Sequence, residues 1–452
     1  MDRSRIQVLR SFTDRTVLRS LLGIHAYVVL FVLLVSAVVA LPQKLGSGAE
    51  DVVLRWNRAL EDTVRTPGQQ PATIVAARSY AMMHGAMYDA VNSIDDSYEP
   101  YLIAVPGTKN ASIEAAAAQA AYDVLVALFP TRESIFQAEL QASMAGVSLY
   151  RRAQGIMVGH QAAAAMLAAR ANDGWMATPT PYVLPLTPGN WQPTPTAFAA
   201  AAFTHYPNVT PFALTSGTQF LPPPPPSLSS LEYAAALNEV KAIGSATSAT
   251  RTADQTEAAR AWGSIGNPTG VAVFWNYIAR SLAIARGTTT VENARLFAMI
   301  NMAHHDALQT SFTSKFQYGL WRPVTAIRRA DEDGNAATDA DPTWLPLIPT
   351  PPYPTYAGNM ASIGMANASV LALVLGRDDL GTTYTFPNPT NATRSWASLA
   401  AIADEATKSR EWGGIHFRFD SVAGQSIGLN TGNYIFTRFM RPRTVCSEVP
   451  AN

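Results

Sequence analysis

The chain has 452 residues, of which 48% are hydrophobic and 15% are charged. This composition supports one large or two smaller packed cores and excludes a disordered chain. Basic side chains (Lys and Arg) number 33, acidic side chains (Asp and Glu) also number 33, and the formal net charge is zero. No overall field draws the protein to nucleic acid or to an anionic membrane, and we expect no nucleic-acid partner. A local cluster of cations must therefore hold any anion that the protein binds.

The N-terminal segment, residues 1–41, is typical of a translocation signal. Several arginines precede an apolar run from Tyr27 to Leu41 that carries no charge. Small residues ending at Ala40 suit cleavage of a signal peptide, whereas a run counted from Leu21 reaches the ~20 residues that span a bilayer. The pattern leaves open a cleaved signal peptide and a retained signal anchor. In both cases we expect a secreted or membrane-anchored protein that faces the extracytoplasmic side.

The spacing of alanine, leucine and methionine predicts an all-α fold in two halves. Residues 42–177 are expected to form a first helical bundle, and residues 231–452 a second one. Residues 178–230, between them, are rich in proline and carry several aromatic side chains. Proline at this density excludes a helix, and the aromatic content predicts a coil that packs across the helices.

An internal repeat relates the two halves. The segment Ala77-Arg-Ser-Tyr-Ala-Met-Met-His-Gly-Ala-Met-Tyr-Asp-Ala matches Ala294-Arg-Leu-Phe-Ala-Met-Ile-Asn-Met-Ala-His-His-Asp-Ala at its arginine, aromatic and aspartate positions. A Trp-Asn pair, at Trp56 and at Trp275, precedes each copy. The repeat predicts a duplicated helical bundle whose two copies pack around one another.

Two cations in the second half point to an anion site. Lys315 and Arg322 are seven residues apart and Pro323 follows directly. On one continuous helix that spacing is about two turns, which directs both side chains the same way. Two like charges on one face repel one another unless an anion lies between them.

A second motif, around Arg410 and His416, supplies a histidine that a carboxylate can orient. Gly413 and Gly414 predict a tight turn, and His416 and Asp420 are then one helical turn apart. A hydrogen bond from the Nδ1 of His416 to Asp420 leaves Nε2 free as a ligand or nucleophile.

The two motifs, Lys-x6-Arg-Pro and Ser-Arg-x5-His-x3-Asp, resemble the first and third signatures of the vanadium-dependent haloperoxidases and the related type 2 phosphatidic acid phosphatases. The duplicated bundle with its proline-rich middle looks like the chloroperoxidase branch. The resemblance implies that Lys315, Arg322 and Arg410 bind the oxygens of vanadate, and that His416 bonds the metal through Nε2. Phosphate has the same charge and shape and can bind in its place.

The middle signature of that family, Pro-Ser-Gly-His, is altered in this chain. By position, Gly358 replaces the serine that bonds the oxyanion, and Met360 replaces the histidine that acts as acid and base. We expect the backbone N–H groups of Gly358 and Asn359 to face the anion, and the Asn359 amide to replace part of the lost hydroxyl. His304 and His305, just upstream of Lys315, are candidates for the missing acid–base role, and Asp306 is placed to orient an arginine of the pocket.

The resemblance implies a haloperoxidase-like enzyme in which hydrogen peroxide oxidises a halide at vanadate bound to His416. Asp420 would orient that histidine. An acid phosphatase, with His416 as nucleophile, and a non-catalytic oxyanion-binding relative are the alternatives. Loss of an acid–base group weighs most against the phosphatase, because a phosphoester leaving group needs a proton. The sequence leaves a homodimer open.

Overall fold

The computed structural model describes residues 50–69, 76–265, 270–387 and 390–443. The expected signal segment, residues 1–41, lies outside these ranges. Within them, no helix combines the length and the apolar character that crossing a bilayer requires.

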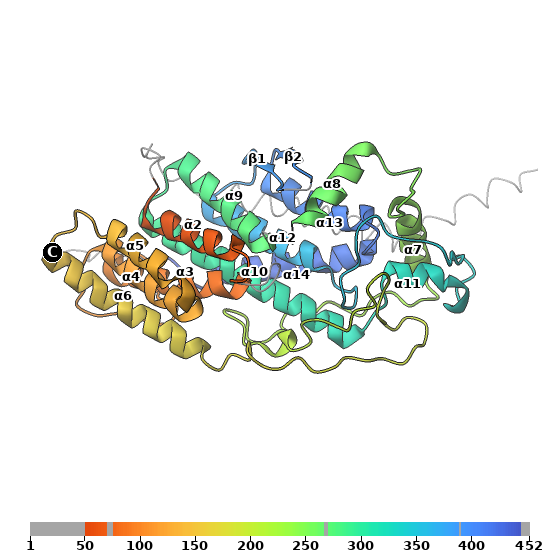
Figure 1. The fold of residues 1–452 in the computed structure, drawn as a ribbon, viewed down its shortest axis with the longest axis horizontal. Helices are drawn as coiled ribbons and strands as arrows, with labels where there is room; N and C mark the ends of the chain where they lie inside the picture. Colours follow the sequence, from red (N-terminus) through yellow and green to blue (C-terminus); the bar gives the residue numbers. More distant parts are fainter. Residues whose placement is uncertain (1–49, 70–75, 266–269, 388–389, 444–452) are drawn as a thin grey trace, which may run out of the picture.

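The described part of the chain is mostly helical, which confirms the all-α prediction (Figure 1). One short hairpin was not predicted: β1 and β2 pair antiparallel, with Thr382 opposite Trp396. The elements are α2 (Val52–Arg65), α3 (Ala76–Asp95), α4 (Ile113–Leu128), η3 (Pro130–Arg132), α5 (Glu133–Ser143), α6 (Leu149–Arg170), η4 (Tyr206–Asn208), α7 (Leu231–Ile243), α8 (Ala253–Ser264), α9 (Gly270–Arg286), α10 (Thr290–Tyr318), α11 (Pro323–Arg328), η5 (Ala330–Glu332), α12 (Asn359–Leu375), β1 (Thr382–Thr385), β2 (Thr393–Trp396), α13 (Leu399–Trp412) and α14 (Arg418–Arg438).

The two repeat segments lie on α3 and α10, and these helices pack against one another as the repeat predicts. Each is the centre of a similar group of helices. In the first half α3 packs on α4 and α6, and in the second half α10 packs on α12 and α14. Figure 1 shows the first group at one end of an elongated molecule and α7 and α11 at the other.

Polar pairs join the two copies where α2 meets α9. The Nδ2 of Asn57 donates to the Oδ1 of Asn276 at 2.7 Å, and these residues are 219 positions apart. The Nη2 of Arg280 donates to the Oε2 of Glu61 at 2.5 Å, again across 219 positions. Because all of these side chains are buried, the copies are held in register by polar contacts inside the core.

The proline-rich coil packs across the helices and runs along one side of the molecule (Figure 1). Its Trp191 is buried, and the backbone N–H of Trp191 donates to the carbonyl of Gly319 at 2.6 Å. In return, the backbone N–H of Trp321 donates to the carbonyl of Gly189 at 2.8 Å. This pair of bonds ties the coil to the loop that follows α10 and thereby places the loop residue Arg322.

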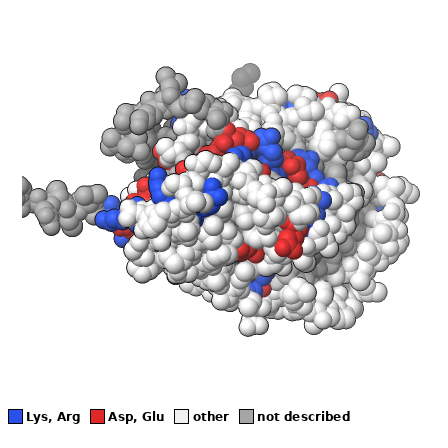
Figure 2. Space-filling model, turned by 60° about the vertical axis from the view of Figure 1, so that its left-hand side comes forward, with Lys and Arg blue, Asp and Glu red and all other residues white. Residues whose placement is uncertain are grey.

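Charged side chains on the face in Figure 2 lie mainly in one band, where basic and acidic groups alternate. The electric fields of neighbouring opposite charges largely cancel one another, and salt screens what remains beyond a Debye length of ~8 Å. This face therefore has no extended region of one charge sign, in keeping with the zero net charge of the chain.

A row of glycines lets α14 approach α12 closely. Gly424, Gly428 and Gly432 are spaced by one helical turn and face α12. A Cβ on Gly428 would overlap the carbonyl oxygen of Ser362, and one on Gly424 would overlap that of Gly358. Helix α6 approaches α4 in the same way through its own glycines. The close contact fixes the start of α12 beside Asp420, which lies in the first turn of α14.

We expect Gly428→Ala to lower the free energy of unfolding by about 1–3 kcal/mol, since the added methyl group overpacks the contact between α12 and α14. Gly364→Ala, in α12, is the control, because its Cβ would meet Ala403 at 3.5 Å, an ordinary contact. Urea unfolding checks both variants. Equal losses in the two variants would contradict the packing argument.

His84 is buried next to the seam between the copies, where its Nε2 lies 2.9 Å from the Nδ2 of Asn57. Burial lowers the pKa of His84 to about 3, so the ring is neutral in the folded protein. His304 is buried in the second half, and burial lowers its pKa to about 3 as well. The neutral rings contribute their full stability above the pKa that histidine has in the unfolded chain. As the pH falls below that pKa, the unfolded chain binds protons that the folded chain does not, and the free energy of unfolding decreases.

We expect each of these two histidines to remove about 2 kcal/mol of stability between pH 7 and pH 5, because the unfolded chain binds the proton and the folded chain does not. His84→Asn, which copies the equivalent residue Asn301 of the second half, should abolish its share of this loss. Urea titrations at the two pH values measure it. An unchanged pH dependence in His84→Asn would show that His84 is not responsible.

Candidate oxyanion-binding site

Lys315 and Arg322 do not lie on one continuous helix, contrary to the expectation from their spacing. Helix α10 ends at Tyr318, and Gly319 follows in the left-handed conformation with φ 59°. Arg322 then caps the N-terminus of α11 in an extended conformation. The left-handed turn at Gly319, a conformation that glycine adopts without strain, ends α10, and Pro323 disfavours a helical conformation for Arg322 before it.

The two cations nevertheless converge, and Tyr353 is where they meet. The Nζ of Lys315 lies 5.5 Å from the centroid of the Tyr353 ring, and the guanidinium carbon of Arg322 lies 5.1 Å from it. The Nε of Arg322 also donates to the Tyr353 carbonyl at 2.8 Å. The loop between α11 and α12 thus covers both cations with one aromatic ring.

Arg410 and His416 are linked by the way in which α13 ends. The N–H of Gly414 donates to the carbonyl of Glu411 at 2.9 Å, and that of Ile415 donates to the carbonyl of Arg410 at 3.0 Å. This is a Schellman motif, which needs a left-handed residue, and Gly414 has φ 79°. The predicted glycine turn therefore brings His416 back alongside the last turn of α13.

Asp420 orients His416, as predicted, although His416 precedes α14 and is not part of it. The Oδ2 of Asp420 lies 3.0 Å from the Nδ1 of His416 and accepts the N–H of Phe417, also at 3.0 Å. The hydroxyl of Thr355 donates to the same oxygen. On the other side of the ring, the Nη1 of Arg322 lies 3.2 Å from Nε2. A neutral His416 with its proton on Nδ1 satisfies both contacts.

Burial and mutual repulsion perturb every charge in the cluster. The pKa of Lys315 falls well below its usual value because of burial and the nearby charge of Arg322. Burial lowers the pKa of Arg322 and of Arg410 to about 10. The pKa of His416 is lowered by burial and by the three cations, and burial raises that of Asp420 to about 6. The site therefore favours an added negative charge.

Backbone carbonyls, and no carboxylate, hold these cations in the described residues. Lys315 donates to the carbonyls of Thr355 and Ala357, at 2.6 and 2.5 Å. Arg322 donates to Ile415 at 2.8 Å, and Arg410 to Trp262 at 3.2 Å. Among the candidate anion ligands of the site, two buried side-chain donors have no partner in the described residues: the Nη2 of Arg322 and the Nδ2 of Asn359.

The segment that aligns with the altered middle signature starts α12, and one of its residues, Gly358, behaves differently from expectation. The N–H of Gly358 donates to the carbonyl of Asp420 at 2.9 Å. This bond occupies the N–H, so the expectation that Gly358 offers it to an anion is wrong in this structure. Met360 is buried and belongs to the hydrophobic core, and its thioether neither donates nor accepts a proton.

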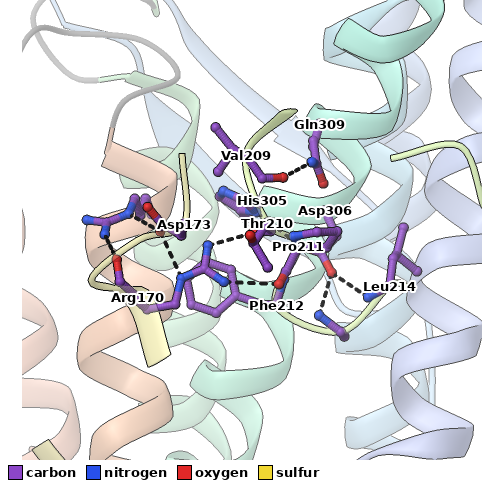
Figure 3. Close-up of polar contacts among 12 residues, drawn as sticks. Arg170, Asp173, Val209, Thr210, Pro211, Phe212, Leu214, His305, Asp306 and Gln309 are labelled. Carbon is purple, nitrogen blue, oxygen red and sulfur yellow. Dashed lines mark hydrogen bonds and ion pairs between the residues drawn. The ribbon is translucent and has the colours of Figure 1, made fainter. Parts of the chain in front are cut away.

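His305 lies in a separate cluster and does not reach the cations. Its Nδ1 is 3.0 Å from the Oδ1 of Asp306, and its ring packs edge-on against Phe212 at 4.8 Å. Figure 3 shows it among Arg170, Asp173 and the coil residues 209–214. Ten residues of α10, a rise of about 15 Å, separate His305 from Lys315. The structure therefore does not support His305 as the acid–base group.

Asp306 has a different task from the one proposed for it, which was to orient an arginine of the pocket. Its carboxylate accepts three successive backbone N–H groups of the coil, those of Phe212, Ala213 and Leu214, at 2.7–2.9 Å (Figure 3). In the first half, Asp89 accepts the N–H groups of Tyr101, Leu102 and Ile103. The repeated aspartate is thus an anchor for loop backbone in both copies.

Several residues of the site were not found by sequence reasoning. Thr355 bonds Asp420 and accepts Lys315, Tyr353 covers two cations, and Ser311 bonds Asn359. Tyr353 and Thr355 lie in a second proline-rich stretch, residues 351–356, just before α12, and that composition is the only sequence signal for them. Ser311 had a weak signal, its position one turn before Lys315.

Within the described residues, no group of three or more His, Cys, Asp or Glu side chains could hold a metal ion. The cluster instead combines one histidine with cations and an amide, a donor set that suits an ion already surrounded by its own oxygens. The two unpartnered donors and the uncompensated positive charge fit a tetrahedral oxyanion such as vanadate or phosphate.

Known proteins share these motifs and this fold. Residues 295–444 match the family model of the VCPO second helical-bundle domain. The vanadium chloroperoxidase of Curvularia inaequalis is 32% identical over 112 residues, which cover 21% of this chain and 18% of that protein. The chain thus aligns with less than a fifth of this curated relative.

Solved structures extend the likeness to most of the chain. A bacterial vanadium-dependent iodoperoxidase superposes with a TM-score of 0.75 at 25% identity, covering 88% of this chain and 99% of its own. The holo form of a bacterial vanadium-dependent chloroperoxidase has a TM-score of 0.65 at 15% identity, covering 86% and 97%, and shares the fold. Fold and motifs together define a protein of the vanadium haloperoxidase superfamily. The chain belongs to that superfamily, and the VCPO-type bundle carries all of its candidate oxyanion ligands.

We expect orthovanadate or phosphate to stabilise the protein against heat, because an anion relieves repulsion among the buried cations. At a ligand concentration of 100 Kd the gain is about 2.7 kcal/mol. Arg322→Ala should abolish the gain. Arg328→Ala, an arginine of α11 that binds the Trp344 carbonyl instead, should retain it. Thermal unfolding with and without each anion makes the comparison, and a gain that survives Arg322→Ala would place the anion elsewhere.

Proposed function

We propose that this protein is a haloperoxidase-like enzyme that binds vanadate at the cation cluster and uses hydrogen peroxide to oxidise a halide. The observation that carries the proposal is a group of three cations, buried Lys315 and Arg322 and half-buried Arg410, beside a histidine held by Asp420. No carboxylate of the described residues forms an ion pair with those cations; Asp420, whose charge acts on Lys315 and Arg322 from nearby, bonds His416 instead. The relatives, whose names state vanadium-dependent peroxidase activities, support the same conclusion.

In this proposal the three cations and Asn359 hold the oxygens of vanadate, and the Nε2 of His416 faces the metal. Bound vanadate supplies a Lewis-acid centre at which peroxide can react with halide. The protein supplies orientation and charge. Asp420 keeps the proton of His416 on Nδ1 and so leaves a lone pair on Nε2. The Nη1 of Arg322, now 3.2 Å from that lone pair, must give way when Nε2 takes a ligand.

The buried position of the cluster strengthens these interactions. Lys315 and Arg322 are fully buried and His416 is 5% exposed, so little water screens their charges. Because the donors are already held by backbone carbonyls, they need little rearrangement when negative charge arrives. Phosphate, with the same shape, competes for the same donors.

Met360 favours a second candidate function, oxyanion binding without turnover. By position, it stands where the family has a histidine that moves protons. General acid–base catalysis typically contributes ~10²–10⁴-fold to a rate. An acid phosphatase depends on it most, because the leaving alkoxide must be protonated. Of the two enzyme functions, the structure therefore supports a slow peroxidase better than a phosphatase.

We expect the purified protein with orthovanadate and hydrogen peroxide to brominate a phenolic indicator slowly, and Met360→His to raise the rate at least tenfold by restoring an acid–base group. His416→Ala should abolish bromination in both backgrounds. Steady-state rates with and without vanadate measure these effects.

The control is Met365→His, which adds a histidine to α12 away from its first turn. A rise in this variant too would mean that the added imidazole acts non-specifically. Vanadate binding without bromination, even in Met360→His, would instead establish the oxyanion-binding function. Hydrolysis of an activated phosphoester that depends on His416 would favour the phosphatase.

A further inference from the structure

Ser311 and Lys315 lie one turn apart on the same face of α10 and reach the same carbonyl oxygen. The Nζ of Lys315 donates to the carbonyl of Ala357 at 2.5 Å, and the Oγ of Ser311 is 3.0 Å from that oxygen. Asn359, the first residue of α12, follows two positions later. Ser311 and Asn359 therefore stand at the edge of the cation cluster.

The two ends of the Asn359 amide are in different situations. Its Oδ1 lies 2.6 Å from the Oγ of Ser311. Its Nδ2 is buried and has no hydrogen-bond partner among the described residues. Buried amide N–H groups almost always have a partner, since an unpaired one keeps the full cost of its lost hydration. Asn359 is connected to Lys315 through Ser311 and the Ala357 carbonyl, and an unpaired Nδ2 beside this cation points to an anion as the missing acceptor.

Ser311 determines which end of the amide is left unpaired. A serine hydroxyl has one proton to donate. The carbonyl of Ala357 already accepts the Lys315 ammonium, and the Oδ1 of Asn359 is the nearer of the two acceptors. When the hydroxyl donates to Oδ1, both Nδ2 hydrogens are available to a ligand.

We propose that Ser311 is a positioning residue for oxyanion binding, which holds the Asn359 amide with its Nδ2 toward the anion. The inference rests on the proposed function only in that the cluster takes a tetrahedral oxyanion. It explains how the site works without the hydroxyl that Gly358 lacks: an amide donor on α12 replaces it, and a serine on α10 keeps that donor in the right orientation.

Removal of Ser311 has a specific consequence under this proposal. Without the hydroxyl, the amide can rotate by 180° and present Oδ1, whose lone pairs repel an anion. Affinity should then fall about tenfold, the effect of one hydrogen bond to a charged group. The loss must act through Asn359, so it should disappear when Asn359 is already absent. A purely structural role for Ser311 would give a loss in both backgrounds.

The experiment is titration calorimetry of the full chain with orthovanadate and with inorganic phosphate. The variants are Ser311→Ala, Asn359→Ala, the double variant and Asn359→Asp. Ser369→Ala is the matched control, because it removes a buried hydroxyl of α12 that bonds only Ala366 in its own helix. Should Ser311→Ala fail to fold, Ser311→Cys, of similar size with a weaker donor, replaces it.

We expect Ser311→Ala and Asn359→Ala each to weaken binding about tenfold, and the double variant to match Asn359→Ala within about twofold. Asn359→Asp, of the same shape but negatively charged, should weaken it further, and Ser369→Ala should not change it. Normal affinity in Ser311→Ala, or a second tenfold loss in the double variant, would overturn the positioning role. A wild-type protein that binds neither anion would instead contradict the proposed function itself.

Discussion

The constraint on which the rest of the site depends is the burial of Lys315 and Arg322, with Arg410 half-buried beside them and only one carboxylate, that of Asp420, nearby. Moving a charge out of water is costly unless other groups solvate it. Here backbone carbonyls from the loops before α12 and after α13 take over that task for Lys315 and Arg322. Those carbonyls must be held rigidly. If the loops relaxed, water would enter, solvate the cations and weaken their attraction for an anion.

The surrounding fold supplies that rigidity from two directions. The glycines of α14 bring its first turn against the start of α12, so Asp420 and Gly358 share a backbone hydrogen bond. Backbone hydrogen bonds at Gly189 and Trp191 tie the proline-rich coil to the loop after α10. The anchor residue Asp306 then fastens the same coil to the middle of α10. Segments that look like connections in the sequence are thus structural supports of the site.

The helical class, the repeat and the charged residues of the site could all be predicted from the sequence, because each depends on local patterns. Helical spacing reports burial, and the motif residues keep their order along the chain. The direction of Lys315 and Arg322 could not be derived in that way, since the turn at Gly319 decides it. The role of Gly358 also escaped prediction, because its N–H partner comes from Asp420, far along the sequence. The prediction for His305 was wrong for a similar reason. The ten residues between His305 and Lys315 are helical, so the two side chains are separated along the axis of α10.

The contacts at the seam between the copies also carry information about how the fold arose. Two identical chains related by a twofold axis would place like residues opposite one another at such a seam. Asn57 and Asn276 still obey that rule, and one asparagine can bond another. Glu61 and Arg280 do not, because two glutamates or two arginines in those places would repel. The ion pair therefore requires unlike halves, whereas the asparagine pair would also form between two identical ones.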